Sequence, residues 1–193
     1  DEKGRVTKQT DGTGAVSTLS YGDGQTSTTD ANGAVTIYYY DKEYRTTKIE
    51  YPDQTSVSKA YDKSNRLIEE TNELKQKTAY TYDESGDILS KTRFDGAVQT
   101  NTYNDKRHLL SEIDYDGKKT LYTYDKSGNL KQIELNDGLK TSFQTNKQGL
   151  IVSSVDALGN KTSYDYSGAF LTKITSPLKG TTNISYNAHG LPT

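Results

Sequence analysis

The sequence contains no cysteine, methionine or tryptophan, and only 3 prolines among 193 residues. Without cysteine, the chain can form no disulfide and offers no thiolate metal ligand. No apolar run reaches the roughly 18 residues of a membrane-spanning helix, so we expect no membrane span. Basic and acidic residues number 24 and 26 and are mixed along the chain. Because nucleic-acid binding surfaces concentrate positive charge, we expect no nucleic-acid partner.

Aliphatic side chains are also scarce. Val, Ile, Leu and Phe together account for 34 of the 193 residues. Such a low share indicates disorder when it accompanies a high net charge, but the net charge here is only −2. The chain has 16 tyrosines, which supply apolar area of another kind. We therefore expect a folded chain without a thick hydrophobic core, built from partly buried aromatic rings.

Tyrosine recurs in phase along the chain. The period is about 21 residues, and an internal period of this length indicates a repeat architecture. Five of the seven in-phase positions begin a Tyr-Asp or Tyr-Asn pair, as in Tyr124-Asp125. We call the in-phase residues the motif tyrosines; they are Tyr40, Tyr61, Tyr82, Tyr103, Tyr124 and Tyr166, and Thr145 takes the seventh position.

Other residue types keep the same phase. A second aromatic residue precedes most motif tyrosines by two positions, as Tyr38, Tyr80, Tyr122, Phe143 and Tyr164. Glycine lies seven positions before the motif tyrosine, as Gly33, Gly96, Gly117, Gly138 and Gly159, and four positions after it, as Gly86, Gly128 and Gly149. An aliphatic residue follows six positions after it, as Leu67, Ile88, Leu109, Leu130 and Ile151. Each unit thus carries two turn signals, an aromatic pair and an aliphatic anchor.

These signals predict an all-β fold of tandem β-hairpins, one per unit. Segments of about six residues lie between the turns, a typical strand length. Residues alternate along TLYTYD, where Tyr122 and Tyr124 share one face. Successive hairpins then pair edge to edge into an open, curved strip of β-sheet. The pairs Asn32-Gly33, Asp95-Gly96, Asp116-Gly117 and Asp137-Gly138 favour two-residue hairpin turns with positive φ at both central residues.

Some units depart from the pattern. The segment Asn72–Gln76 has no glycine, so we expect a wider turn there. The step from Tyr166 to Tyr186 is shorter than the others by one residue, and the step from Tyr21 to Tyr40 is shorter by two. At Gly180, where the phase is lost, the need for glycine is less certain than at Gly117 or Gly138.

The recurring Tyr-Asp pair favours a structural interpretation. In it, the tyrosine packs on the sheet and the Asp or Asn side chain accepts hydrogen bonds from nearby backbone N–H groups in a turn. A ligand-binding ladder of tyrosines is the alternative.

The segments YDKSGNL, from Tyr124 to Leu130, and YDESGDI, from Tyr82 to Ile88, resemble the YD repeat, also called the RHS repeat. This family includes bacterial Rhs proteins, wall-associated toxins of Gram-positive bacteria, insecticidal toxin complexes and animal teneurins. The resemblance extends over nearly all of residues 1–193, as a single array of about eight to nine units. Both ends are expected to interrupt a unit, because DEKGRV continues one and YNAHGLPT begins another.

The resemblance implies a long β-sheet strip that spirals into a hollow shell. Such a shell encloses a C-terminal toxin domain used in contact-dependent competition, or serves as an extracellular scaffold. The implied partners are the rest of the shell and the enclosed toxin domain, and the implied location is secreted or cell-wall associated. The family's self-cleaving terminal segment, with its Asp-Pro-x-Gly-Leu motif, has no match here, so no catalytic residue is carried over.

The remaining residues point to no enzyme, cofactor or metal. His108 and His189 lie in expected turns without an in-phase partner, which disfavours a metal site or a catalytic triad. Carboxylates recur with the repeat, whereas a catalytic pair is singular. A glycan-binding or adhesive module for the cell wall or cell surface, using exposed tyrosine rings, is the alternative function; the absence of tryptophan argues against it.

Overall fold

The computed structural model describes all 193 residues, which form two compact units, residues 1–98 and 99–193. Each unit is described on its own. All regular secondary structure is β-strand, as the repeat pattern predicts. No helix long and apolar enough to cross a membrane is present.

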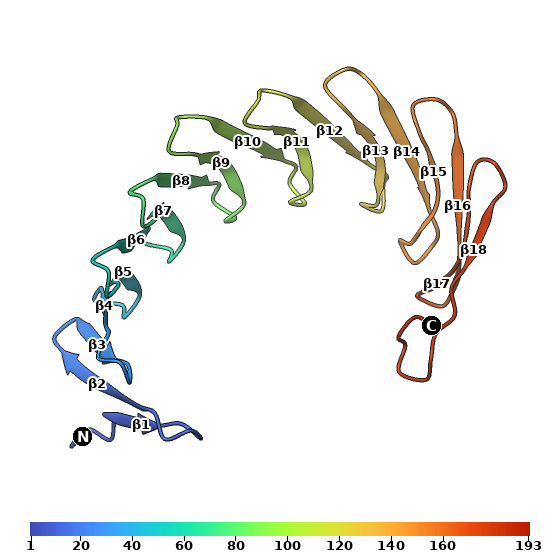
Figure 1. Cartoon of the computed structure of the whole chain (residues 1–193). Helices are drawn as coiled ribbons and strands as arrows, with labels where there is room; N and C mark the ends of the chain where they lie inside the picture. The colour runs from blue at the N-terminus through green and yellow to red at the C-terminus, as the bar shows by residue number, and fades with distance from the viewer. The chain divides into compact units, whose positions relative to one another are not determined.

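The strands follow one another at regular intervals (Figure 1). The first unit contains β1 (Lys8–Thr10), β2 (Val16–Gly22), β3 (Gln25–Thr29), β4 (Val35–Tyr40), β5 (Thr46–Glu50), β6 (Ser56–Tyr61), β7 (Leu67–Thr71), β8 (Lys77–Tyr82) and β9 (Ile88–Thr92). The second contains β10 (Val98–Tyr103), β11 (Leu109–Ile113), β12 (Lys119–Tyr124), β13 (Leu130–Glu134), β14 (Lys140–Thr145), β15 (Ile151–Val155), β16 (Lys161–Ser167), β17 (Phe170–Thr175) and β18 (Thr181–Asn183).

Within each unit, every strand pairs antiparallel with the next strand in sequence. The pairing does not return from the last strand to the first, so each unit is an open sheet. Each repeat contributes two strands, as expected. Contacts are therefore local in sequence, and stability accumulates from one repeat to the next.

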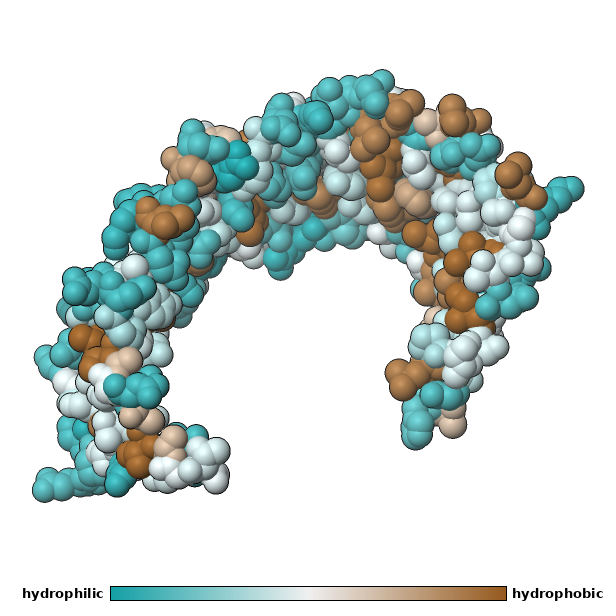
Figure 2. Space-filling model, in the orientation of Figure 1, coloured by the Kyte–Doolittle hydropathy of each residue, from teal (hydrophilic) through white to brown (hydrophobic).

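Neither unit has a buried apolar core. No hydrophobic residue is buried, and Ser153, with 3% of its surface exposed, is the buried polar residue. Figure 2 shows hydrophobic side chains in separate surface patches among hydrophilic ones. The low aliphatic content of the sequence agrees with this absence of a core. A single layer of sheet shields its side chains only in part, so neighbouring hairpins must supply the remaining contacts.

The loops at Asn32-Gly33, Asp95-Gly96, Asp116-Gly117 and Asp137-Gly138 contain three residues rather than the two predicted. In the loop between β11 and β12, the Asp114 amide donates a hydrogen bond to the Lys118 carbonyl, and the Gly117 amide donates one to the Asp114 carbonyl at 3.0 Å. Only Gly117 has positive φ, at 77°. This is a type I turn followed by one left-handed residue, the usual three-residue hairpin loop. The prediction of two-residue turns was wrong because an Asp-Gly pair suits both loop types.

The left-handed position does not require glycine. Lys75 has φ 63° and Gln54 has φ 66° at positions where other repeats have glycine. The loop at Asn72–Gln76 has the same hydrogen bonds as its counterparts, from Asn72 N to Gln76 O and from Lys75 N to Asn72 O. The wider turn predicted there is therefore wrong. At the end of the chain, Lys179 takes the left-handed φ of 63°, and Gly180 does not.

A β-bulge recurs directly before the motif position. Thr123 pairs with Gln132 but Tyr124 pairs with Leu130, so Lys131 is the additional residue. Bulges bend the strand and increase its local twist. Equivalent shifts precede Tyr40, Tyr61, Tyr82, Tyr103, Thr145 and Tyr166.

Loop length and bulge together explain the two short repeats. Asp23-Gly24 and Gly168-Ala169 are two-residue loops, closed by the pairs Gly22↔Gln25 and Ser167↔Phe170. The repeat after Tyr166 keeps its bulge and so loses one residue. The repeat after Tyr21 pairs without a register shift and loses two. The numbers of residues lost equal the numbers by which the spacings Tyr166 to Tyr186 and Tyr21 to Tyr40 fall below the common period.

We predict that Gly117→Ala and Gly138→Ala each destabilise the fold by roughly 1 kcal/mol or more, because alanine is strained at positive φ. Their φ angles are 77° and 80°, and an added Cβ meets no atom within 4 Å, so strain alone is tested. Gly12→Ala is the matched control, since its φ is ordinary and its surroundings are open. Urea unfolding measures the difference, and equal midpoints for all three variants would contradict the loop geometry.

Candidate functional site

The hydroxyl group of the motif tyrosine bonds to the preceding repeat. Tyr124 Oη donates to the carbonyl of Leu109 at 2.8 Å, and Tyr82 Oη donates to the carbonyl of Leu67 at 2.6 Å. The same bond joins Tyr21 to Val6, Tyr61 to Thr46, Tyr166 to Ile151 and Tyr186 to Leu171, at 2.7, 3.3, 2.9 and 2.9 Å. The phenol therefore links one hairpin to the hairpin before it.

The accepting carbonyl lies where the backbone ladder stops. Strands β11 and β12 pair from Ser111↔Leu121 to Ile113↔Lys119, and Leu109 lies beyond this paired stretch. A backbone carbonyl without a partner is costly when it is shielded from water. The Tyr124 side chain replaces the missing ladder bond with a side-chain one.

In five repeats, the residue that closes the motif loop covers the tyrosine ring of the next repeat. We call it the loop-closing residue. His108 lies against Tyr124 with ring centroids 4.7 Å apart, and Phe170 lies against Tyr186 at 5.0 Å. In the first unit the ring is covered by arginine: Arg5 over Tyr21 at 4.1 Å, Arg45 over Tyr61 at 5.0 Å and Arg66 over Tyr82 at 5.0 Å. Such cation–π and aromatic pairs each contribute about 0.5–1.5 kcal/mol.

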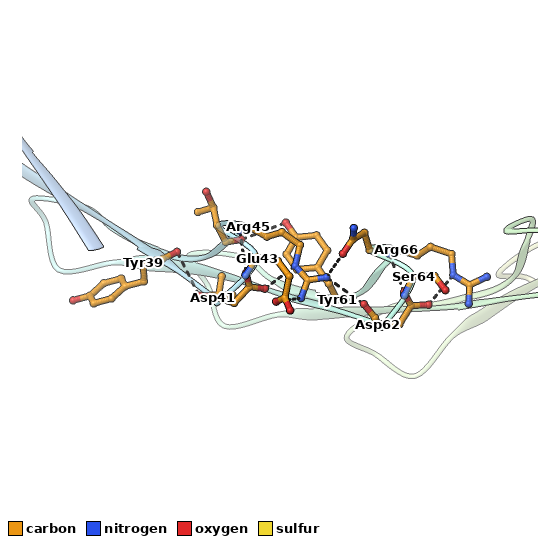
Figure 3. A network of polar contacts seen from close by, with 11 residues as sticks. Tyr39, Asp41, Glu43, Arg45, Tyr61, Asp62, Ser64 and Arg66 are labelled. Carbon is orange, nitrogen blue, oxygen red and sulfur yellow. Dashed lines mark hydrogen bonds and ion pairs between the residues drawn. The ribbon is translucent and has the colours of Figure 1, made fainter. Parts of the chain in front are cut away.

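Arg45 shows how one side chain joins two loops (Figure 3). Its Nε donates to Asp41 Oδ2 at 2.6 Å within its own loop. Its Nη1 donates to the Asp62 carbonyl at 3.2 Å and to Asn65 Oδ1 at 2.6 Å in the next loop. Arg66 repeats the pattern one unit later, with Nη1 donating to the Asp83 carbonyl at 2.6 Å. The network extends over three successive motif loops.

The Asp or Asn after the motif tyrosine holds its own loop together. Asp125 Oδ1 accepts hydrogen bonds from the amides of Ser127 at 2.8 Å and Asn129 at 2.9 Å. Asn146 Oδ1 accepts the equivalent pair from Gln148 and Leu150. Because only one acceptor oxygen is needed, Asp and Asn serve equally in this Asx turn.

These contacts shift the pKa values of the groups involved. The Arg66 amide is the largest cause that lowers the pKa of Asp62, and the Asn129 amide lowers the pKa of Asp125. Burial raises the pKa of the Tyr122 and Tyr124 phenols. The ionised carboxylates and the neutral phenols are thus the forms that the fold favours.

The second set of tyrosines packs across the sheet. Tyr122 is paired with Ile133, Tyr38 with Ile49 and Tyr164 with Ile174. The hydroxyl of Tyr80 donates to Glu70 Oε1 at 2.7 Å, and Tyr164 Oη lies 3.3 Å from Ser154 Oγ.

Hydrogen bonds are also formed at the motif tyrosines Tyr40 and Tyr103. The Tyr40 amide donates to the Gly24 carbonyl at 2.8 Å. Tyr103 Oη accepts from Asn101 Nδ2 at 3.4 Å.

The eight glycines of the turn signals all occupy the left-handed region. Their φ angles range from 77° to 89°, at Gly33, Gly86, Gly96, Gly117, Gly128, Gly138, Gly149 and Gly159.

Both histidines lie in loops. The His108 ring covers Tyr124, and the His189 amide donates to Asn187 Oδ1 at 2.9 Å in a loop. No group of three or more His, Cys, Asp or Glu side chains could hold a metal ion.

One groove brings tyrosine rings together. It has a volume of about 620 Å³ beside the short loop Asp23-Gly24, and Arg5, Tyr21, Tyr40 and Tyr44 lie among its lining residues. Tyr44 is 87% exposed at its rim.

The loop-closing residue is the functional position that the sequence pattern did not reveal. Arg5, Arg45, Arg66, His108 and Phe170 differ in charge and shape, so no single residue type marks the position. A signal was present, because Arg45, Arg66 and His108 each lie five residues after a motif tyrosine.

We predict that Tyr124→Phe destabilises the fold by about 0.5–1.5 kcal/mol, because the Leu109 carbonyl loses its 2.8 Å hydrogen bond while the ring is kept. Tyr44→Phe is the matched control, since that side chain is 87% exposed. Chemical denaturation of the two variants beside the parent tests this, and an unchanged Tyr124→Phe midpoint would argue against the phenol as a link.

The lowered pKa of Asp125 predicts an acid-sensitive loop. Its contribution to stability is present above the ordinary Asp pKa of about 3.9 and is lost as the pH falls through the lower folded value. Asp125→Asn keeps the acceptor oxygen but cannot titrate, so its unfolding midpoint should fall less between pH 5 and pH 2 than that of the parent. Carboxyl-carbon NMR titration provides the direct value; an Asp125 pKa at or above about 3.9 would refute the assignment.

Comparison with known proteins gives the same picture of the fold. Residues 61–98 match the family model described as RHS Repeat. No curated protein sequence matches the chain. Three crystal structures are similar over 100% of this chain: TcdB2-TccC3-TEV (13% identity, TM-score 0.59), TcdB2-TccC3 (13%, 0.58) and TcdB2-TccC3 without hypervariable C-terminal region (12%, 0.57).

The chain spans 15% of the length of these structures, and at such identity the likeness shows the fold alone. The recognised segment includes Tyr61 and Tyr82, two consecutive motif tyrosines. The bonds and stacking contacts of this segment recur in the repeats on either side. Residues 61–98 are therefore recognised as RHS repeat, the YD-repeat family that the wider sequence resembles.

Proposed function

We propose that this chain is a non-catalytic structural segment of an RHS-repeat shell that encloses or presents a C-terminal toxin domain in contact-dependent bacterial competition. The observation that carries the proposal is that the recurring side chains of the motif contact other parts of the same chain. The phenol of Tyr124 and the carboxylate of Asp125 are bonded to the chain's own backbone, and His108 packs on a ring. The recurring polar groups thus join repeats and hold loops.

The absence of a core fits a wall-forming role. Each unit is one layer of sheet with half-exposed faces, which is a wall rather than a globular binding domain. Similarity to TcdB2-TccC3 supports the proposal, since one of those structures is described as lacking a hypervariable C-terminal region. A variable C-terminal domain next to a constant repeat wall is the arrangement expected of an interchangeable cargo. The proposed partners are the remaining shell and this cargo, in a secreted or cell-wall-associated protein.

Limited proteolysis of the full-length protein tests the proposal. We predict that the C-terminal domain is protected in the parent and becomes cleavable when the wall is loosened by the double change Gly117→Ala, Gly138→Ala. The double change Gly12→Ala, Tyr44→Phe is the control and should preserve protection. A C-terminal domain that is digested equally in all three proteins would exclude enclosure. Hydrolase, nuclease or protease turnover lost in His108→Ala or His189→Ala would exclude a non-catalytic role.

A glycan-binding or adhesive module is the second candidate, and the groove beside Asp23-Gly24 is the observation in its favour. Tyr40 and Tyr44 line it, and Tyr44 is widely exposed. Saturable binding to a glycan array or to isolated cell walls, lost in Tyr44→Ala, would favour this function.

A further inference from the structure

One motif tyrosine of the first unit has no side chain stacked on its ring. In the next repeat, Arg45 lies over the ring of Tyr61 from a position sixteen residues earlier in the chain (Figure 3). Gly24 has this position relative to Tyr40, and glycine has no side chain to place over the ring. No aromatic or cationic side chain stacks on Tyr40 from elsewhere in the chain.

The two-residue loop Asp23-Gly24 accounts for this difference. Gly24 lies within the turn itself, with φ of 66°, a conformation that favours glycine over residues with a side chain. The backbone stays paired up to the loop, since the Tyr40 amide donates to the Gly24 carbonyl at 2.8 Å. The Tyr40 hydroxyl forms no hydrogen bond within the chain, unlike that of Tyr61. Both the ring and the hydroxyl of Tyr40 are therefore available to a ligand.

The groove at this loop is larger than its counterpart in a repeat whose ring is covered. Its volume is about 620 Å³, and Tyr40 and Tyr44 are among its lining residues. The counterpart beside Tyr124, where His108 covers the ring, has a volume of about 450 Å³. The larger volume agrees with the lack of a covering side chain at Tyr40.

An arginine that covers a motif tyrosine also donates hydrogen bonds to the loop after that tyrosine. Arg45 Nη1 donates to the Asp62 carbonyl and to Asn65 Oδ1, from residues one and four positions after Tyr61. Arg66 repeats the bond to the loop carbonyl one unit later. At both sites a guanidinium group thus contacts an aromatic ring and a backbone carbonyl beside it.

The same kinds of groups line the groove at Tyr40. Asp41 and Tyr44 follow Tyr40 by one and four residues, as in the arginine-covered repeats, and both line the groove. Asp23 lines it too, and its carboxylate forms no hydrogen bond or ion pair within the chain. An aromatic ring, a backbone carbonyl and a carboxylate together suit a planar cation that stacks and donates several hydrogen bonds.

We propose that this groove binds the guanidinium group of an arginine side chain supplied by another polypeptide. The guanidinium would lie over the Tyr40 ring and donate hydrogen bonds to the Asp41 carbonyl and the Asp23 carboxylate. Three repeats of the same unit define the ligand, because each places an arginine over its motif tyrosine at 4.1–5.0 Å. The proposal goes beyond the wall function and does not depend on it, and it assigns an occupant other than a glycan to this groove.

The two cations that line the groove are compatible with such a ligand. Arg5 is neutralised by Asp1 at 2.7 Å. Lys42 has the same position in its repeat as Lys63, and Arg45 is accommodated there. The groove is open and the ligand is a single side chain, so we expect weak binding, with a Kd on the order of millimolar.

Titration with a capped Gly-Gly-Arg-Gly-Gly peptide, followed by amide NMR of the protein, tests the proposal. Saturable shifts are expected at Gly24 and at Lys42, whose amide shares a peptide bond with the Asp41 carbonyl, with Gly117 as the unaffected reference. The same peptide with citrulline in place of arginine keeps the shape but not the charge, so it should bind about two- to tenfold more weakly. A lysine peptide should also bind more weakly, because its ammonium group is not planar.

Variants of the protein assign the peptide to the groove. Asp23→Asn and Tyr40→Leu should each weaken binding of the arginine peptide about two- to fivefold. Tyr40→Phe keeps the ring and should bind like the parent. Asp116→Asn is the matched control for the carboxylate, since it changes an exposed loop residue of the other unit and should leave binding unchanged.

Each further outcome decides the proposal. Equal binding of the arginine and citrulline peptides would overturn it, whether or not Tyr40→Leu folds, and equal binding of the lysine peptide would overturn the assignment to a guanidinium. Unchanged binding in Asp23→Asn and in folded Tyr40→Leu would exclude this groove as the site. Free arginine that binds more tightly than the peptide would rule out a polypeptide as the source. Saturable shifts at Gly24 with tri-N-acetylchitotriose but not with the arginine peptide would replace the proposal with glycan binding.

Discussion

The hydrogen bond from a phenol to a backbone carbonyl of the preceding repeat is the interaction on which the rest of this structure depends. A single-layer sheet cannot stabilise itself through a core, and none is present. Its neighbouring hairpins must be joined at the end where their ladder stops, and the motif tyrosine is long enough to do so. The ring then needs a cover, which the loop-closing residue supplies, and the loop needs a fixed geometry, which Asp or Asn supplies. In the Tyr-Asp pair, the tyrosine thus links neighbouring repeats and the Asp or Asn fixes the conformation of its own loop.

The strands, the turns and the repeat could be predicted from the sequence because a few residue types recur with the period. Tyrosine and glycine in phase indicate strands, turns and a repeat, and the structure contains them where expected. The loop type could not be predicted: Asp116-Gly117 fits a two-residue and a three-residue loop equally, and the difference lies in which residues close it. The bulge before Tyr124 was hidden because any residue can occupy it. The covering contact was hidden because Arg66, His108 and Phe170 satisfy it by different means.

The left-handed loop position also explains why such repeats are hard to recognise by sequence. Glycine fits best there, yet Tyr44, Gln54, Asn65, Lys75 and Lys179 adopt the same φ of about 60°. The hydrogen bonds of the loop are strong enough to hold these residues in a disfavoured region, at a cost on the order of 1 kcal/mol each. The same backbone therefore persists at 13% identity to TcdB2-TccC3-TEV.

The two short repeats carry a consequence for how such chains lengthen and shorten. Deleting one residue from a β-strand ordinarily turns every later side chain to the opposite face. Here the missing residues come from the loop and the bulge around Tyr21 and from the loop after Tyr166, and the strands that follow resume the common register. Each loop acts as a fresh starting point for pairing, so errors of replication that add or remove residues stay confined to one hairpin. The register of a hairpin is therefore set by its own loop and not by the number of residues that precede it.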